Sequence, residues 1–283
     1  MNIVNPKFEE INLANPLQHG EMCARVCYKS ENYIAEGSAK KLLNNIVSAG
    51  HTAMLEHIPV YLRFDIEHSA KAMNNVTPIM SSPYSKTNVD FEEGYTYVST
   101  NLRVIYEKFP DLYEVYMQND GEPFELIEQG IKNCKYVEFP SKFVKRITIK
   151  FTMDRIGSQS FCRHRLFSFA QESTRWCNFM KAKFGSEISI SNPCWLKEED
   201  RVEFEEDMKI SEQLYFKWLE KGYKAEEARY FLPFGLNTEI IMTGFPDAWQ
   251  HFFELRNDSH AHSQAQFLAK PLEEYFKSKK YIQ

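Results

Sequence analysis

The chain has 283 residues, 43% of them hydrophobic and 26% charged, a composition typical of globular proteins with a buried core. Its formal net charge of −5 argues against general nucleic-acid binding, which needs a basic surface. No apolar run is long enough to span a bilayer, and the first residues lack the pattern of a secretory signal.

The six cysteines do not have the spacing of a disulfide framework or of a zinc site. We interpret them as small buried apolar residues of a chain in a reducing compartment. These features predict a cytoplasmic protein with no membrane contact, no nucleic-acid partner and no bound metal.

The first half of the chain predicts one helix and two strands. Apolar periodicity indicates a helix over residues 37–50, with Ser38 as its N-cap and Gly50 as its stop. Segments 57–66 and 144–154 alternate apolar and polar residues, which is typical of half-buried strands.

Between these two strands lies a long connection, residues 70–143, with a turn-rich stretch and a predicted helix around residues 100–109. A structureless connection of this length is uncommon inside a domain, so we expect an inserted subdomain.

After residue 185 the pattern predicts a short strand and then helices. They fall at 188–195 for the strand and at 201–221, 225–233, 246–256 and from about 259 to 277 for the helices. Asp258 or Ser259 is expected to cap the last helix and Pro271 to kink it. The chain therefore predicts an α+β fold, a single domain over residues 1–283 with a mixed or antiparallel sheet flanked by helices.

Residues 163–175, which we call the basic segment, read RHRLFSFAQESTR and combine positive charge with an apolar setting. From Arg155 to Gly185 the chain has six Arg or Lys residues and one Glu, a local charge of +5 in an acidic chain. Guanidinium groups stay charged and present planar donors that suit phosphate oxygens. The segment predicts a site for a small anion, with a basic surface loop as the alternative.

Other motifs carry weaker signals. HTAMLEH at 51–57 matches no zinc motif, and His260 and His262, two apart on a helix, cannot face one metal together. A nucleophile at a serine or cysteine of 162–177 has no elbow motif around it and no base paired with it by sequence. Arg256 ends the helix HFFELR, either to compensate the helix dipole or to aim a charge into a pocket.

The segment 163–175 matches RHRxxSxxxxSxR, the signature of the flavin-dependent thymidylate synthases, at every defined position. Other segments are similar in the same order, among them ARVCY, HTAMLEH, EARYFLP and HFFELR. The chain is thereby identified as a member of that family. The resemblance implies conversion of dUMP to dTMP with FAD as cofactor and methylenetetrahydrofolate and NADPH as co-substrates. It also implies a homotetramer whose active sites lie between subunits.

The resemblance assigns two overlapping sets of residues. FAD is expected to contact His51, Arg163, His164, Arg165, Gln171 and His251. dUMP is expected to contact Ser160, Arg163, Gln171, Glu172, Ser173, Thr174, Arg175, Arg229 and Arg256. Within the second set, Arg229 comes from a neighbouring subunit, and Arg256 is the catalytic residue that favours ionisation of the uracil ring.

Three positions depart from the family pattern. Ser160 stands where many members have Glu or Gln, Phe245 replaces an Asn expected to contact flavin, and Asp247 replaces an Arg. Two alternatives therefore stay open. One is a nucleotide-binding or RNA-binding relative with little or no turnover, which Phe245 favours. The other is a folate-only thymidylate synthase with a cysteine nucleophile and no flavin.

Overall fold

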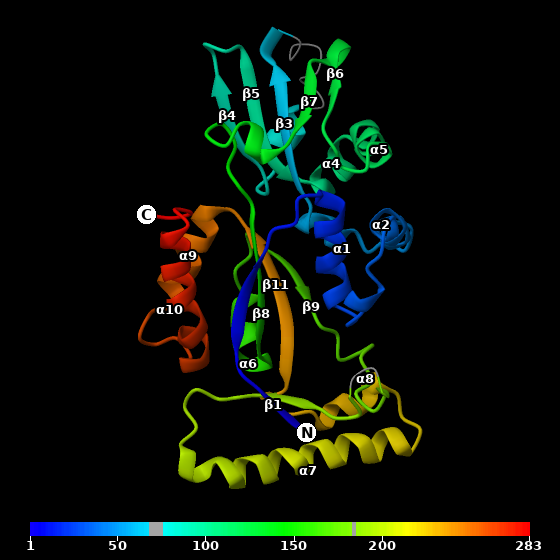
Figure 1. The fold of residues 1–283 in the computed structure, drawn as a ribbon, viewed down its shortest axis with the longest axis vertical. Helices are drawn as coiled ribbons and strands as arrows, with labels where there is room; N and C mark the ends of the chain where they lie inside the picture. The colour runs from blue at the N-terminus through cyan, green and yellow to red at the C-terminus, as the bar shows by residue number, and fades with distance from the viewer. Residues whose placement is uncertain (68–75, 183–184) are drawn as a thin grey trace.

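The structure is a computed structural model that describes residues 1–67, 76–182 and 185–283. Lys183, one of the six Arg or Lys residues between 155 and 185, and residues 70–75 of the expected insertion lie outside the described residues. Three parts follow one another along the long axis: a lobe of strands at the top, a central sheet with helices on both sides, and a long helix at the bottom (Figure 1).

The central sheet has four antiparallel strands in the order β2-β8-β11-β9. Their bounds are β2 Lys7–Ile11, β8 Ile147–Asp154, β9 Ser168–Gln171 and β11 Asn237–Gly244. β8 and β11 pair along their whole lengths, from Ile147 opposite Gly244 to Asp154 opposite Asn237. β9, which is the middle of the basic segment, is an edge strand of this sheet.

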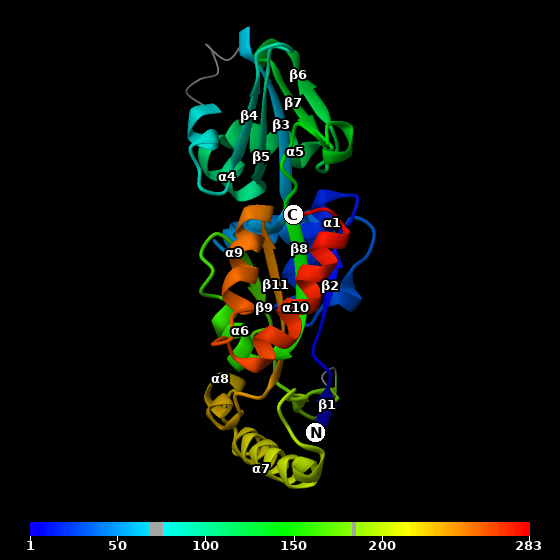
Figure 2. The ribbon, with the colours of Figure 1, turned by 90° about the vertical axis from the view of Figure 1, so that its left-hand side faces the viewer.

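Helices cover both faces of the central sheet (Figures 1 and 2). α9 Pro246–Arg256 and α10 Ser263–Ser278 lie on one face, and α1 Pro16–Val26 lies on the other. Alternate β8 residues, among them Ile149 and Phe151, pack with fully buried Trp249 of α9. Burial of each such side chain stabilises the fold by about 1.5–3 kcal/mol.

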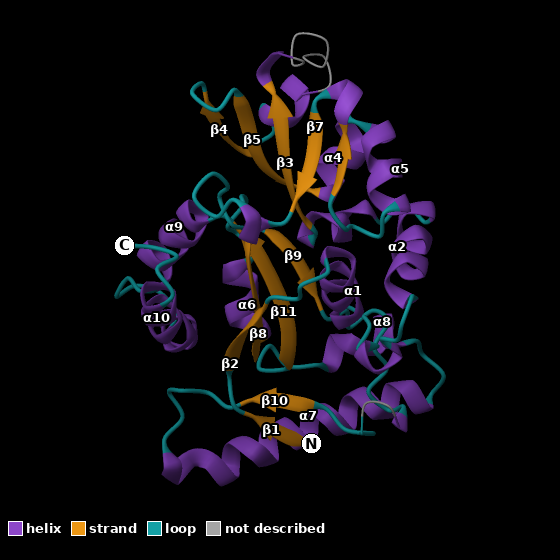
Figure 3. Cartoon of the chain, turned by 45° about the horizontal axis from the view of Figure 1, so that its top comes forward, coloured by secondary structure: helices purple, strands orange, loops and turns teal. Residues whose placement is uncertain are grey.

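The upper part, which we call the β3–β7 lobe, contains a five-stranded antiparallel sheet in the order β4-β5-β3-β7-β6 (Figure 3). Its strands are β3 Pro59–Asp65, β4 Lys86–Asp90, β5 Tyr95–Asn101, β6 Phe124–Leu126 and β7 Ile131–Cys134. α4 Leu102–Lys108 and α5 Pro110–Gln118 pack against it. The lobe has its own core, and α2 Ser38–Ser48 contributes Leu43 to it.

The lower part holds a parallel pair, β1 Asn2–Val4 with β10 Ser189–Ser191, and helices α7 Arg201–Glu220 and α8 Ala225–Ala228. The structure also has a helix α6 at Arg155–Phe161. Its 3-10 turns include η1 Glu31–Tyr33, η2 Thr52–His57, η3 Ile127–Gln129, η4 Tyr136–Glu138, η6 Glu198–Asp200 and η7 Arg229–Phe231. Within the described residues, no helix is both long enough and apolar enough to cross a membrane.

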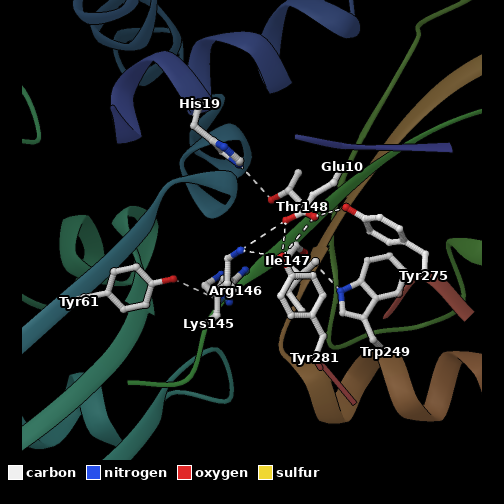
Figure 4. Close-up of polar contacts among 10 residues, drawn as sticks. All are labelled: Glu10, His19, Tyr61, Lys145, Arg146, Ile147, Thr148, Trp249, Tyr275 and Tyr281. Carbon is white, nitrogen blue, oxygen red and sulfur yellow. Dashed lines mark hydrogen bonds and ion pairs between the residues drawn. The ribbon is translucent and has the colours of Figure 1, made fainter. Parts of the chain in front are cut away.

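The β3–β7 lobe meets the central sheet where β8 begins (Figure 4). The backbone N–H of Arg146 donates to the hydroxyl of Tyr61 in β3 at 3.2 Å. Beside it, Lys145 donates to Glu10 of β2 at 3.4 Å, and the Tyr281 hydroxyl donates to the same carboxylate at 2.9 Å. β2 near the N-terminus, Tyr281 near the C-terminus and the lobe therefore all contact the two residues that precede β8, Lys145 and Arg146.

The predicted α+β architecture, with antiparallel sheets flanked by helices, is confirmed. The predicted cap of α2 is wrong: the N-cap is Gly37, whose φ of 74° is left-handed and suits glycine. Ser38 is the first helical residue, and its hydroxyl donates to Glu21 at 2.7 Å.

The predicted cap of the last helix is also wrong, because neither Asp258 nor Ser259 caps α10. The side chain of Asp258 accepts a bond from the backbone N–H of His260 at 2.8 Å and so closes a turn before the helix. The cap is His262, whose Nδ1 accepts from the backbone N–H of Gln264 at 3.3 Å.

Candidate functional site

The first half of the basic segment lines a cavity of 330 Å³ against α9. We call it the Arg256 cavity, and its lining residues are Arg163, His164, Arg165, Leu166, Phe167, Asp247, Ala248, His251, Leu255 and Arg256. The loop between α6 and β9 supplies one wall, and α9 supplies the other. Phe167 fixes this loop because it packs on Gly244 so closely that an added Cβ would come within 2.6 Å of its ring.

Arg256 and His164 face each other in this cavity. Nε of Arg256 donates to Nε2 of His164 at 2.9 Å, so the imidazole proton is on Nδ1. Burial, together with the charge of Arg256, lowers the pKa of His164 to about 4. His164 is therefore neutral at pH 7, and Arg256 keeps its positive charge.

Three arginines of the Arg256 cavity have no carboxylate partner among the described residues: Arg163, Arg165 and Arg256. The one acid of the lining, Asp247, is ion-paired with Lys86 of β4 at 2.5 Å. The cavity thus offers guanidinium groups whose charge no carboxylate neutralises, beside the apolar side chains of Leu166 and Leu255. This combination suits a ligand that has both phosphate and an aromatic ring.

A second cavity, of 250 Å³, lies near the other end of the basic segment. We call it the Arg229 cavity, and its lining residues are Arg155, Thr174, Arg229, Tyr230, Leu232, Pro233, Phe234 and Leu236. It shares no lining residue with the Arg256 cavity. One chain therefore presents two separate cationic cavities, one at each end of the basic segment.

A family model described as "Thymidylate synthase complementing protein" matches residues 103–279, more than half of the chain. The chain belongs to this family. The match extends from the β3–β7 lobe to α10 and includes both cavities. The membership inferred from the signature is thereby confirmed.

Individual relatives agree with the family. A probable flavin-dependent thymidylate synthase of Paramecium bursaria Chlorella virus 1 is 29% identical over 162 residues, 53% of this chain and 74% of that protein. The flavin-dependent thymidylate synthase of Saccharolobus solfataricus is 32% identical over 123 residues, 43% of this chain and 46% of that protein. The Thermococcus kodakarensis protein of the same name is 32% identical over 141 residues, 48% of this chain and 57% of that protein. The chain thus spans about half the length of most of these relatives.

Among solved structures, the UMP/dUMP methylase PolB from Streptomyces cacaoi, bound with 5-Br dUMP, is similar over 98% of this chain and 93% of that chain. The TM-score is 0.43 and the sequence identity is 15%, and a likeness this weak adds nothing to the assignment.

Three residues that the resemblance assigned to ligand contacts lie outside the two cavities. His51 is exposed at the start of η2 and lines neither cavity. The hydroxyl of Ser160 donates to the carbonyl of Gly157 at 2.6 Å, inside its own helix. Gln171 donates to the Ser158 hydroxyl at 2.8 Å. These three predicted contacts remain predictions.

The residues that follow Gln171 run toward the Arg229 cavity. Glu172 is buried and ion-paired with Lys29 at 3.4 Å, and the backbone N–H of Ser173 donates to the carbonyl of Cys27 at 3.0 Å. Thr174 lines the cavity itself. The side chain of Arg175, which is 61% exposed, forms an ion pair with Glu226 at 2.9 Å.

The two departures at the start of α9 have partners in the β3–β7 lobe or next to it. Phe245 is buried, and the guanidinium carbon of Arg146 lies 5.0 Å from its ring centre. Lys86 of β4 lies 5.8 Å from the same ring and pairs with Asp247. Phe245 has no side-chain donor or acceptor, so it cannot make the hydrogen bond that the resemblance led us to expect from an Asn at this position.

Sequence reasoning did not select Arg155, which the structure brings to the wall of the Arg229 cavity beside Thr174 and Arg229. The one signal in the sequence was its membership in the basic excess of residues 155–185. Its cavity partners are distant along the chain, and no local pattern joins them.

Proposed function

We propose that this protein is a flavin-dependent thymidylate synthase that converts dUMP to dTMP in the cytoplasm, with methylenetetrahydrofolate as carbon donor and NADPH as reductant. The observation that carries the proposal is the Arg256 cavity, where three guanidinium groups without carboxylate partners among the described residues meet an apolar wall. Membership of the family and the names of its relatives support the same activity.

The Arg256 cavity suits a flavin nucleotide by its donor set. Arg163 and Arg165 can donate to phosphate oxygens, and His164 presents a neutral imidazole because of its lowered pKa. When bound, FAD supplies the hydride that turns a transferred methylene into a methyl group. His251, exposed on α9 and part of the same lining, is the other residue that we assign to its contact surface.

Arg256 would act on the pyrimidine. Carbon 5 of uracil becomes nucleophilic only when negative charge can gather on the ring nitrogen and carbonyl oxygens. A fixed guanidinium in a half-buried position stabilises that charge more than water does, since the dielectric is lower. The bond to His164 fixes the direction of the Arg256 fork before substrate arrives.

The dUMP phosphate would bind at the other half of the signature, near Ser173, Thr174, Arg175 and Arg229. Because the two cavities share no residue, a complete site would be formed by two copies of the chain in a homotetramer. Exposed apolar residues beside both cavities support such an interface: Leu166, Leu255, Trp176, Tyr230 and Phe234.

The test combines a flavin spectrum with an assay of products. The purified protein should bind about one FAD per chain and form dTMP from dUMP, methylenetetrahydrofolate and NADPH. The rival is a nucleotide-binding relative without turnover, which the burial of Phe245 at an expected flavin contact favours. A protein that binds dUMP but neither takes up FAD nor forms dTMP would establish the rival.

A further inference from the structure

A further cavity, of 330 Å³, lies where the β3–β7 lobe meets the central sheet. We call it the lobe cavity, and it shares no lining residue with the Arg256 cavity or the Arg229 cavity. Its lining includes three tyrosines, Tyr61, Tyr116 and Tyr136. Exposed Leu13, between β2 and α1, and exposed Val137, in η4, mark its open side. Aromatic and apolar walls with a few polar groups are typical of small-molecule sites, and here they suit a planar ring.

Positive charge predominates among the residues that line the lobe cavity. Three are cationic, Lys135, Lys145 and Arg146, and one is acidic, Glu10. The Glu10 carboxylate accepts hydrogen bonds from two tyrosine hydroxyls and pairs with Lys145 at 3.4 Å (Figure 4). Lys135 pairs at 2.8 Å with Glu122, which lies outside the lining. Arg146 is then the cation of this lining that has no carboxylate partner in the described part of the chain.

The Arg146 guanidinium is buried and only partly satisfied. Its Nη2 donates to the Glu56 carbonyl at 3.2 Å and to the Ser168 hydroxyl at 3.3 Å. Its Nε and Nη1 have no hydrogen-bond partner among the described residues. A buried cation without a counter-charge is costly, because it has lost its hydration. A negative group bound in the lobe cavity would offset part of that cost through its charge.

Buried His19 is the uncharged polar group of this site. Its Nε2 bonds to the Thr148 hydroxyl at 3.0 Å, and its Nδ1 has no partner within the described residues. Burial, and then the charges of Arg146 and Lys145, lower its pKa to about 4, although Glu10 acts in the opposite direction. The ring is therefore neutral at pH 7, and positive charge outweighs negative charge at its position. An anion is favoured there, and Nδ1 can share a hydrogen bond with it.

We propose that the lobe cavity is a binding site for a small aromatic carboxylate, separate from the two cavities assigned to the reaction. The ring would lie against the tyrosines, and the carboxylate would lie near His19 and Lys145. Lys145 is partly exposed and can contact the carboxylate directly, whereas buried Arg146 adds its charge from behind. A ligand with one negative charge matches the single cation that no carboxylate neutralises. The volume is at the lower end of the range for ligand pockets and suits one or two fused rings.

The experiment uses 2-naphthoate and its neutral analogue 2-naphthamide, each measured by equilibrium dialysis against the full chain. We expect one 2-naphthoate per chain with a Kd of about 1 mM or tighter, as for a ligand of this size. 2-Naphthamide should bind at least about fivefold more weakly, since it lacks the charge. No saturable binding of 2-naphthoate, or equal affinities for the two probes, would overturn the proposal. Neither FAD nor dUMP takes part, so the result is independent of the proposed function.

A pair of substitutions at the open side locates the bound probe. Val137 is 76% exposed, so Val137→Glu and Val137→Lys should both fold like the parent. The glutamate should weaken 2-naphthoate about two- to fivefold and the lysine should strengthen it by a similar factor, with 2-naphthamide unchanged. The matched control is Val202→Glu: Val202 is 70% exposed on α7 and lines none of the three cavities. It should leave both probes unchanged.

Equal losses in Val137→Glu and Val202→Glu would overturn the proposal, because the added charge would then act on the protein as a whole. Parent-like binding in both Val137 variants would place the probe elsewhere and would overturn it too. Lys145→Gln tests the contact itself and should weaken 2-naphthoate about tenfold, as for a lost charge-assisted bond. An unchanged affinity would refute the site. If Lys145→Gln does not fold, the two Val137 variants decide.

Discussion

Nε of Arg256 and Nε2 of His164 are 2.9 Å apart, and this bond joins the end of α9 to the first half of the signature. The pair couples the residue assigned to the pyrimidine with one assigned to the flavin. Since Arg256 can only donate, His164 must accept, and it can do so only while its Nε2 is unprotonated. Protonation of His164 would therefore break the bond and place two positive charges side by side.

Buried histidines predict a loss of stability in acid. Burial and the charges of Arg146 and Lys145 lower the pKa of His19 to about 4, and burial and the neighbouring His19 lower that of His57 to about 3. Below the unfolded value near 6.5, the unfolded chain takes up protons that the folded chain does not. The free energy of unfolding should therefore fall between about pH 6.5 and 4, by up to about 3 kcal/mol from His19 alone.

Urea denaturation at a series of pH values from 7 to 4 measures this effect. His19→Asn keeps a side chain that can bond to the Thr148 hydroxyl, which His19 contacts at 3.0 Å, but removes the titrating group. The variant should lose less stability over this range than the parent. Identical pH profiles would contradict the assignment of the acid sensitivity to His19.

The ion pair between Lys86 and Asp247 should tune the charge of the Arg256 cavity. In Lys86→Met, the Asp247 carboxylate is left unpaired beside the cationic lining and should weaken FAD binding about two- to fivefold. Asp247→Asn should strengthen FAD binding by a similar factor. Both effects are small because the two side chains are 38% and 58% exposed, so that solvent screens them.

Fluorescence titration with FAD measures these changes, and the double variant is their control. In the background of Asp247→Asn, loss of Lys86 should have little further effect, since the carboxylate that it neutralised is gone. If Lys86→Met weakens FAD equally in both backgrounds, lysine would act on the ligand directly, and the pairing role would be wrong.

Arg256→Lys separates positive charge from donor geometry. Lysine keeps the charge but replaces a planar fork with a single ammonium, so stabilisation of charge on uracil should fall. We expect at least about a tenfold loss in dTMP formation, which corresponds to about 1.4 kcal/mol in the barrier. Oxidation of NADPH without dUMP should change little. Parent-like dTMP formation would return Arg256 to the role of a charge that compensates the dipole of α9.

Local patterns in the sequence predicted some of the elements and the signature, but they did not predict α1 or β11, nor the contacts that complete the site. α9 and α7 follow from apolar periodicity with a proline or a glycine at their ends, and they form as expected. β9 lies within the signature, and the sequence did not predict it. Its residues SFAQ are too few to show the alternation of a strand, and charged residues stand close to them on both sides. Lys86 and Asp247 are 161 residues apart, and only the β3–β7 lobe brings them together.

The division of the site between two cavities predicts complementation between inactive variants. Arg256→Ala should abolish one half-site and Arg229→Ala the other, and each homomeric variant should be nearly inactive. After the two proteins are unfolded together and refolded as a mixture, a site that takes Arg256 from one copy and Arg229 from another is intact in about a quarter of cases, if copies associate at random in a symmetric oligomer. The measurement is dTMP formation by the mixture beside each variant refolded alone, with light scattering to confirm that both refold to the same tetramer. If the mixture stays as inactive as its components while its oligomeric state matches the parent, both arginines serve the same copy and the proposed sharing of sites is wrong.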